Sequence, residues 1–518
     1  METPADAVFM GTPRSARPAP TNGWDVVSAV RIAEVNLAIA AAGSSPEGFE
    51  TDGGGVRAAG AFGPWTLTED GDGPLITLRV PMHGVDLDTG GKARTIASAT
   101  AAVRVRLELL PTGRMRAGAD GPAGAEHLLV VRTGVDAGLL SADPAARAAK
   151  VLDIETSQDL PITATAALMQ ALEDWLNANL HAFRHVFGAV DIVSMTEEEA
   201  QGTAFAWLKP SSVSYAFGAN RRHPDRSILA FLCQTAGRSS GGLVHQTEAD
   251  AIPDGAQAGL CISYRRFLTD MLAPSLAFTF KGLKVTARHF KAQDTGLYFP
   301  DPIQLDKQTI DGATYAPAIE RMEITLRDDE IEIESLTRTE ITPGLYSMCQ
   351  NVSAFTFGLL AGASGKTLGY KPTRQPIENH WKEQSPALDI LHWMLLALSA
   401  VAVVVLGIAT AGAFTAVAGA MVCALTGLGV AMLTQDIIGK VAEGKGPTID
   451  LFALNATGSV RWCTGPRFDP VNAGLNGSLQ IGGNLVAPKG VGPVAALQGF
   501  QAEFADFMAA RPAAHPAP

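Results

Sequence analysis

The chain contains a run of 46 residues, from 390 to 435, without one formally charged side chain. Alanine, leucine, valine and glycine make up most of this run, whereas the sequence around it is polar and acidic. A segment of this length without charges must be buried in protein, in lipid, or in each at different times. The environment of this run therefore largely determines what the protein does.

The run divides into two apolar stretches, 391–409 and 414–433. An α-helix of about 20 residues is about 30 Å long, which matches the hydrocarbon core of a bilayer. Close packing of two such helices is favoured by small residues, here Gly412, Gly419, Gly427 and Gly429. We therefore expect an apolar helical hairpin over residues 388–440.

Three interpretations of this hairpin are open. It spans a membrane permanently, or it covers an apolar groove and moves to a membrane, or it is a static part of the core. Its high content of alanine and glycine favours the last two. The side chains expected to contact lipid or membrane are Trp393, Leu395, Leu398, Val403, Leu406, Phe414, Val417, Leu425, Leu428 and Met432.

The overall charge argues against a nucleic-acid partner. The formal net charge is −12 and the isoelectric point is about 5.4, whereas nucleic-acid binding needs clustered lysine and arginine. The five cysteines are widely spaced and form no C-x-x-C pair, so neither a disulfide framework nor a zinc site is expected. We expect no metal and no cofactor.

Strand patterns dominate outside the run. Val103, Val105, Leu107 and Leu109 alternate with charged residues, as in a strand that is buried on one face. Residues 65–81 predict a hairpin around a Gly-Asp-Gly turn, and residues 322–334 predict a second hairpin with isoleucine and leucine inside and glutamate outside.

A long amphipathic helix is expected after Pro161, with its end near Gly188. Its apolar positions recur at steps of three and four residues: Leu168, Leu172, Trp175, Leu176, Leu180, Phe183 and Phe187. This stripe packs against a sheet as plain core, or it lines a cavity. In the second case Leu168, Leu172, Trp175, Leu176 and Phe183 contact an apolar ligand.

These patterns predict an α+β fold, because one-sided strands and a few long helices occur without βαβ alternation. We expect a long curved antiparallel sheet rolled around amphipathic helices, with the apolar hairpin as an insertion.

Several motifs occur in an order that resembles a known family. They are Asn22-Gly-Trp-Asp-Val-Val, Phe62-Gly-Pro-Trp-Thr-Leu, Leu75-Ile-Thr-Leu-Arg-Val-Pro, Trp207-Leu-Lys-Pro-Ser, Tyr215-Ala-Phe, Ser227-Ile-Leu-Ala-Phe-Leu and Cys261-Ile-Ser. Together they resemble the OrfX proteins and their 47-kilodalton companion, which are encoded beside some clostridial neurotoxin genes. The resemblance covers residues 22–290 well and the remainder loosely.

The resemblance implies a TULIP (tubular lipid-binding) fold, in which a rolled sheet encloses a groove for lipid or another apolar ligand. It also implies partners encoded in the same gene cluster and no enzymatic activity. A role as a toxin accessory does not follow automatically, because the alanine- and glycine-rich sequence differs from those of low-GC clostridia.

The expected organisation has five parts. Residues 1–20 form a disordered leader, 21–387 the TULIP-like body, 388–440 the apolar hairpin, 441–509 the C-terminal strands and helix that complete the body, and 510–518 a disordered tail. The first 20 residues lack the apolar core of a signal peptide. We therefore expect synthesis in the cytoplasm, with membrane association or export by another route left open.

Motifs for catalysis are weak. Gly365-Lys-Thr resembles the end of a phosphate-binding loop, but Leu360 stands where that loop needs glycine. His181 and His185 are four residues apart, but no third metal ligand is near in sequence. The favoured function is a non-enzymatic lipid- or membrane-binding protein with the hairpin as its lid or membrane-engaging element. The alternative is an accessory protein of a toxin complex or secretion system, in which the body is a scaffold for protein partners.

Overall fold

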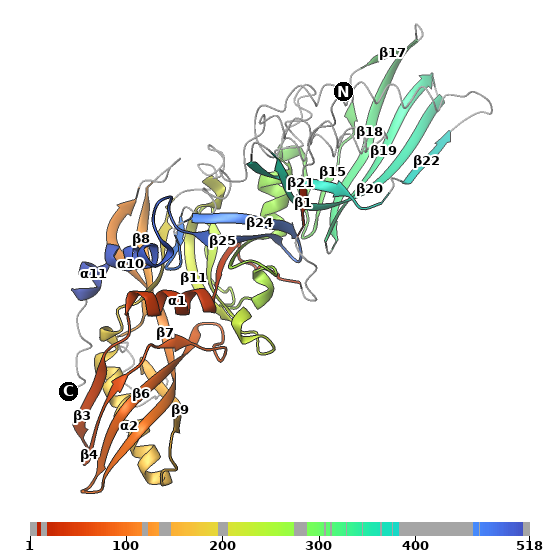
Figure 1. Cartoon of the computed structure of the whole chain (residues 1–518). Helices are drawn as coiled ribbons and strands as arrows, with labels where there is room; N and C mark the ends of the chain where they lie inside the picture. The colour runs from red at the N-terminus through yellow and green to blue at the C-terminus, as the bar shows by residue number, and fades with distance from the viewer. Residues whose placement is uncertain are drawn as a thin grey trace.

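The computed structural model describes residues 8–11, 18–116, 123–133, 147–194, 206–273, 287–304, 307–310, 313–327, 329–343, 345–362, 365–374, 377–382, 459–465 and 467–510. The expected apolar hairpin, residues 388–440, lies outside this part of the chain. Within the described ranges, no helix is both long and apolar enough to cross a bilayer. The strands form three antiparallel sheets arranged along an elongated molecule (Figure 1).

The first sheet has nine strands in the order β23-β10-β8-β7-β6-β4-β3, with β5 paired to β6 and β9 paired to β7. Their bounds are β3 Gly48–Gly53, β4 Val56–Phe62, β5 Thr66–Leu67, β6 Leu75–Thr89, β7 Ala93–Arg116, β8 Gly124–Val131, β9 Ala149–Thr156, β10 Val186–Ile192 and β23 Val460–Trp462. The pairing of β5 with β6 confirms the hairpin predicted over residues 65–81. In β7, Val103, Val105 and Leu107 are buried, as their alternation predicts.

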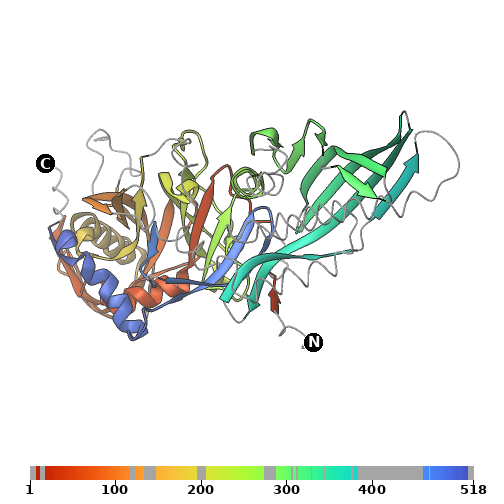
Figure 2. The same cartoon turned by 90° about the horizontal axis from the view of Figure 1, so that it is seen from above.

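Helix α2 (Ile162–Asn179) packs inside this sheet. It contacts β9 on one side and β3, β4 and β6 on the other, so the sheet curves around it. Figure 2 shows α2 as the yellow helix enclosed by the orange strands. The burial of its apolar stripe in the concave face is the reason that this stretch forms a helix in a sheet-dominated chain.

The predicted extension of this helix to Phe187 is wrong. The α-helix ends at Asn179, the 3₁₀ turn η2 covers Leu180–Ala182, and β10 begins at Val186. Phe187 and Gly188 lie in that strand, where Gly188 pairs with Leu129 and Trp462. Apolar spacing alone did not reveal the change, because Phe183 and Phe187 are buried in either conformation.

The second sheet has six strands and lies in the middle of the molecule, in the order β11-β12-β2-β13-β25-β24 (Figure 1). The bounds are β2 Val26–Arg31, β11 Pro210–Gly218, β12 Ile228–Thr235, β13 Ala258–Ile262, β24 Arg467–Leu475 and β25 Leu479–Val486. All residues of β2, β12 and β13 are buried. On β12, Phe231 belongs to the main core, whereas Ala230 and Leu232 belong to a second apolar cluster on the opposite face.

The third sheet has ten strands, in the order β1-β20-β19-β18-β15-β14, with β16 and β17 paired to β18, and β21 and β22 paired to β20. The bounds are β1 Val8–Met10, β14 Lys291–Ala292, β15 Gly296–Phe299, β16 Ile303–Gln304, β17 Gln308–Ile310, β18 Ala313–Arg327, β19 Glu330–Thr342, β20 Leu345–Gly362, β21 Gly365–Pro372 and β22 Ile377–Lys382. Ile324 pairs with Ile333 and Leu326 with Ile331, all buried, which confirms the hairpin predicted around residues 322–334.

Strands near each end of the chain pair with strands that are distant in the sequence. The disordered leader predicted over residues 1–20 is incorrect for Val8–Met10, because these residues form β1 and pair with Leu359–Ala361 of β20. Backbone pairing with the long strand β20 thus outweighs the polar, proline-rich composition around these residues. After residue 458, the chain adds β23 to the first sheet and β24 and β25 to the second.

The remaining helices are short and lie at the surface or between strands. They are α1 Ile32–Ala42, η3 Ala206–Leu208, η4 Pro224–Arg226, η5 Ala249–Ala251, α4 Tyr264–Arg266, the π-helical turn η6 Phe267–Leu272, η8 Ala287–His289, α10 Pro493–Glu503 and α11 Ala505–Ala509. Helix α10 packs on α1, and Gln501 of α10 bonds both backbone groups of Val186 at the start of β10.

Candidate functional site: an aspartate and three arginines at one end of the central sheet

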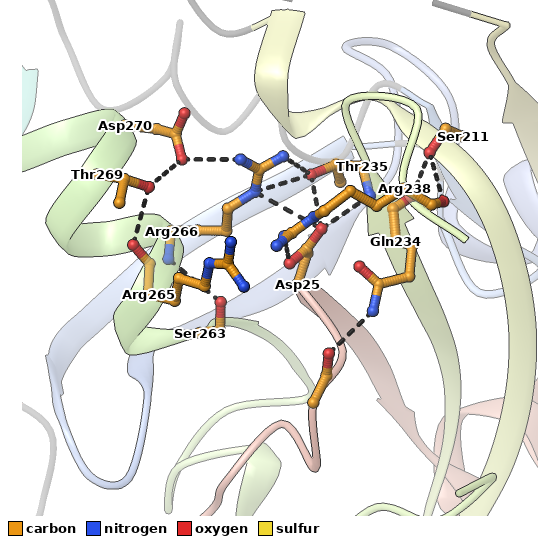
Figure 3. Close-up of polar contacts among 11 residues, drawn as sticks. Asp25, Ser211, Gln234, Thr235, Arg238, Ser263, Arg265, Arg266, Thr269 and Asp270 are labelled. Carbon is orange, nitrogen blue, oxygen red and sulfur yellow. Dashed lines mark hydrogen bonds and ion pairs between the residues drawn. The ribbon is translucent and has the colours of Figure 1, made fainter. Parts of the chain in front are cut away.

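The register of the central sheet brings three charged segments together. Val26, the first residue of β2, pairs with Cys233 of β12 and with Ile262 of β13. The residue before β2, the end of β12 and the helix after β13 therefore meet at one end of the sheet. Figure 3 shows this cluster, which contains Asp25, Thr235, Arg238, Arg265, Arg266 and Asp270.

Two tight turns shape the cluster. Asn22 and Gly23 both have positive φ angles, 51° and 87°, and the Trp24 amide donates to the carbonyl of Thr21 at 2.9 Å. Ala236 and Gly237 have φ angles of 53° and 74°, and the Arg238 amide donates to the carbonyl of Thr235 at 3.1 Å. Two successive left-handed residues define a type I′ turn, for which Asn-Gly is a favoured sequence. The turns place Asp25 and Arg238 on the same side of the sheet end.

Asp25 is the buried centre of the cluster. One carboxylate oxygen, Oδ2, accepts hydrogen bonds from the backbone amide of Thr235 at 2.9 Å and from its hydroxyl at 3.1 Å. The other, Oδ1, contacts Nη2 of Arg238. Only 2% of Asp25 is exposed, so this carboxylate depends on these partners in place of water.

Arg266 is as deeply buried as Asp25, and its side chain reaches from α4 to Thr235 at the end of β12. Ser263 caps α4 by accepting from the Arg266 amide, which fixes where the side chain starts. The guanidinium donates from Nη2 to the Thr235 hydroxyl at 2.6 Å and from Nη1 to Asp270 at 3.0 Å. Its Nε lies 3.5 Å from Oδ2 of Asp25. Arg266 is thus matched by two carboxylates.

The guanidinium group of Arg238 has fewer hydrogen-bond partners than that of Arg266. Its Nε is buried and has no hydrogen-bond partner within the described part of the chain. The pKa of Arg238 is lowered to about 10, mainly by burial and then by the neighbouring guanidinium groups of Arg266 and Arg265, while Asp270 opposes the shift. Three arginines therefore face two aspartates, and within the described residues one positive charge of the cluster has no counter-charge.

The chemistry of this cluster suits the binding of an anion. The nearby thiols of Cys233 and Cys261 are buried, and burial raises their pKa values to about 12 and about 11, so neither is a ready nucleophile. Among the described residues, no group of three histidine, cysteine, aspartate or glutamate side chains could hold a metal ion. Guanidinium groups instead favour carboxylate and phosphate oxygens.

The helical residues proposed to contact lipid lie elsewhere, in the core of the first sheet. Leu168, Leu172 and Leu176 are fully buried in the main hydrophobic cluster. Trp175 is half-buried against Phe49 and Phe62. Phe183 is buried and stacks on Trp65 with their ring centroids 4.9 Å apart.

The other proposed lipid contacts lie outside the described residues: Trp393, Leu395, Leu398, Val403, Leu406, Phe414, Val417, Leu425, Leu428 and Met432. Within the described part, a cavity of about 10 Å³ lies where Ser28, Trp462 and Phe468 meet. That volume holds about one water molecule and is far too small for an acyl chain.

Sequence reasoning did not identify the arginine cluster. Its members are spread from Asp25 to Asp270, and only strand register brings them together. Two local signals were available: Asn-Gly directly before a buried strand, and the spacing of Arg266 and Asp270 by four residues on a helix. Neither signal predicts that the segment before β2 and the helix that carries Arg266 lie in contact.

Comparison with known proteins gives relatives along nearly the full length. The chain is 26% identical over 503 residues to Protein OrfX3 of Paraclostridium bifermentans, covering 90% of this chain and 99% of that protein. It is 28% identical over 507 residues to Protein OrfX3 of Clostridium botulinum (strain Kyoto / Type A2), covering 90% and 98%.

Solved structures agree on the fold. The structure of P47 from Clostridium botulinum A2 aligns with a TM-score of 0.58 at 15% identity, covering 90% of this chain and 98% of P47. P47 of Clostridium botulinum E1 also aligns with a TM-score of 0.58, at 14% identity and with 90% and 100% coverage. The family pattern described as OrfX-like, Protein OrfX2/OrfX3/P47, matches residues 21–483. This chain therefore belongs to the OrfX-like family.

Proposed function

We propose that this protein is a non-enzymatic binding protein of the TULIP type, which engages lipid or a membrane surface through its uncharged run, residues 390–435. The observation that carries the proposal is the length of that run in an acidic chain. The stretches 391–409 and 414–433, each of which would be about 30 Å long as a helix, have no charge that would oppose transfer from water to hydrocarbon.

The described residues support the run, rather than α2, as the main apolar contact. The apolar stripe of α2 is already buried by strands of its own sheet, and Leu168, Leu172 and Leu176 have no exposed surface left. The run is connected to Lys382 at the end of β22 and, beyond residue 458, to β23. Its attachments therefore lie on two different sheets, the third and the first.

Lipid extraction and vesicle flotation test this proposal. Protein purified without detergent is extracted with organic solvent, and any lipid is identified by mass spectrometry. We expect flotation of the wild type with phosphatidylcholine vesicles and its loss in the double variant Leu398→Asp/Leu428→Asp, because a charge in the apolar core costs about 3 kcal/mol. The matched control is Met115→Asp, which adds a charge at a residue that is already 65% exposed. A wild type that carries no lipid and ignores vesicles would overturn the proposal.

A second candidate is a scaffold for protein partners from the same gene cluster. It is favoured by apolar side chains that remain exposed on and beside the packed helices α1 and α10. Leu37 is 61% exposed, Val491 41% and Val494 56%. Exposed apolar side chains that gather on one face are typical of protein-interaction sites.

Co-purification with the cluster-encoded proteins distinguishes the two candidates. A scaffold that uses this surface keeps its partner after delipidation and loses it in the variant Leu37→Asp/Val494→Asp. Retention of the partner by that variant, together with loss of lipid by Leu398→Asp/Leu428→Asp, would favour the first candidate.

A further inference from the structure

We infer that Arg238, Arg265 and Arg266 form a binding site for a small oxyanion of the phosphate or sulfate type. This inference is independent of the proposed lipid function, because it uses a different surface and different residues. It rests on the charge balance of the cluster, on one unsatisfied donor, and on the direction of two side chains.

The charge balance leaves one arginine without a counter-charge. Asp25 contacts both Arg238 and Arg266, and Asp270 accepts from Arg266. Arg265 is exposed, and no ion pair or hydrogen bond of its guanidinium group occurs within the described ranges. Its backbone carbonyl accepts from the Thr269 hydroxyl at 2.9 Å.

The two aspartates do not repel an incoming anion strongly, because their oxygens are already engaged. Oδ2 of Asp25 accepts two hydrogen bonds from Thr235, and Oδ1 contacts Arg238. Oδ2 of Asp270 accepts from Arg266 and from the Thr269 hydroxyl at 2.7 Å. An added anion would therefore meet mainly the exposed guanidinium group of Arg265 and the side of Arg238 that faces it.

Geometry provides the receiving donors. Figure 3 shows the guanidinium groups of Arg238 and Arg265 directed toward the same space beside Asp25. Nε of Arg238 is buried and unpartnered, and a buried donor without an acceptor is costly. A tetrahedral oxyanion can accept from two guanidinium groups at once, which would satisfy this donor and offset the repulsion between the two cations.

A structural salt-bridge network is the competing explanation. It accounts for Asp25, Arg266, Asp270 and Thr235, whose groups satisfy one another. It does not account for Arg265, whose charge lies next to two other guanidinium groups, nor for the Nε of Arg238.

Titration with inorganic phosphate and sulfate tests the site. Thermal unfolding and isothermal titration are followed for the full chain, with chloride at matched ionic strength as the reference. We expect phosphate to raise the Tm of the wild type in a saturable way, since a ligand that binds only the folded state stabilises it. Arg265→Gln is expected to weaken phosphate binding about tenfold or more, from the loss of a charge-assisted hydrogen bond.

The matched control is Arg221→Gln, which removes one positive charge from an exposed loop outside the cluster. It is expected to bind phosphate as the wild type does. Arg265→Lys keeps the charge but loses the planar fork, and is expected to bind with intermediate affinity. Circular dichroism confirms that each variant folds, which is expected because Arg265 is exposed.

A vesicle arm identifies the source of the anion. Phosphatidylcholine vesicles are compared with and without phosphatidylglycerol, for the wild type and Arg265→Gln. Saturable binding of free phosphate that depends on Arg265 supports a soluble anion, and Arg265-dependent flotation only with phosphatidylglycerol supports a phosphodiester on a membrane. If phosphate raises the Tm no more than chloride does, and if Arg265→Gln floats with the vesicles as the wild type does, no oxyanion site exists at this cluster.

Discussion

At the scale of single residues, His185 is the most isolated ionisable group of the first sheet. It is fully buried, its ring packs against those of Phe183 and Phe187, and its Nδ1 lies 3.0 Å from the Ser44 hydroxyl. Its Nε2 has no hydrogen-bond partner within the described part of the chain. Burial lowers the pKa of His185 from 6.5 to about 3, so the ring stays neutral in the folded protein.

We therefore predict an acid-sensitive contribution to stability from His185. Above pH 6.5 the ring is neutral in both states, so its contribution does not change. As the pH falls from 6.5 toward 3, the unfolded state binds a proton that the folded state does not, and stability falls by up to about 1.4 kcal/mol per pH unit. Urea unfolding between pH 7 and pH 5, above the range in which most carboxylates titrate, measures this slope.

The variant His185→Phe isolates the effect. It keeps an aromatic ring in the stack but cannot titrate, so its stability is expected to depend less steeply on pH than that of the wild type. His223→Gln is the control, because His223 is exposed and its removal should leave the slope unchanged. Parallel curves for the wild type and His185→Phe would show that the folded protein accommodates the proton.

Ala236 gives a second prediction at this scale. Its φ of 53° is left-handed, a conformation that costs a residue with a Cβ about 1–2 kcal/mol. Ala236→Gly removes that cost but gives the unfolded chain more freedom, worth about 0.4–1 kcal/mol. We expect a net stabilisation of about 0.5–1 kcal/mol in chemical unfolding.

The control for that substitution is Ala216→Gly, in the buried strand β11. Glycine weakens a strand interior, so this variant is expected to lose about 0.5–1 kcal/mol. Equal destabilisation by both variants would mean that the turn at Ala236 is not strained.

At the scale of elements, α2 is the helix on which the first sheet depends. Leu172 is fully buried in the main core, so Leu172→Ala is expected to destabilise the protein by about 2–5 kcal/mol through lost burial and a cavity. Ile162→Ala, on the same helix, removes a side chain that is 88% exposed and should change stability by less than about 0.5 kcal/mol.

Thermal and chemical unfolding of the two variants measure this difference. If Leu172→Ala leaves the free energy of unfolding almost unchanged, α2 lines an open cavity rather than a packed core. In that case α2 would again be a candidate for contact with an apolar ligand.

Local patterns predicted the elements whose burial is one-sided. The alternation in β7 and in the β18–β19 hairpin follows directly from a sheet with one buried face. The central strands β2 and β12 carry a continuous apolar run, which marks burial but does not tell which strands pair. The order β11-β12-β2-β13-β25-β24 pairs residues as distant in sequence as Val30 with Ala258 and Ala258 with Gly483, and no local signal encodes such pairings.

The candidate site was not predictable for the same reason. Asp25 needs Arg238 and Arg266 to be stable when buried, but their meeting depends on the register of β2 against β12 and β13. The end of α2 was mispredicted because an apolar residue at every third or fourth position satisfies a helix, a 3₁₀ turn and a buried strand alike.

At the scale of the whole molecule, the C-terminal strands join sheets that are formed mainly by the first half of the chain. β23 pairs with β10 of the first sheet, while β24 and β25 complete the central sheet beside β13. Trp462 of β23 lies at the boundary: its indole nitrogen donates to the Ser28 hydroxyl at 3.2 Å, and its ring centroid lies 4.7 Å from that of Phe231. Ser28 and Phe231 belong to the central sheet, so one buried side chain bridges two sheets.

Trp462→Ala should therefore weaken both sheets together. Removing a buried indole is expected to cost about 3–5 kcal/mol, and Trp462→Phe should cost less because the aromatic contact with Phe231 remains. Hydrogen exchange read by mass spectrometry separates the consequences, because local opening and global unfolding protect amides differently. Joint loss of protection in β10 of the first sheet and β12 of the central sheet would show that they unfold as one unit. Loss confined to β10 and β23 would instead show that the two sheets are independent, and that Trp462 only closes the edge of the first sheet.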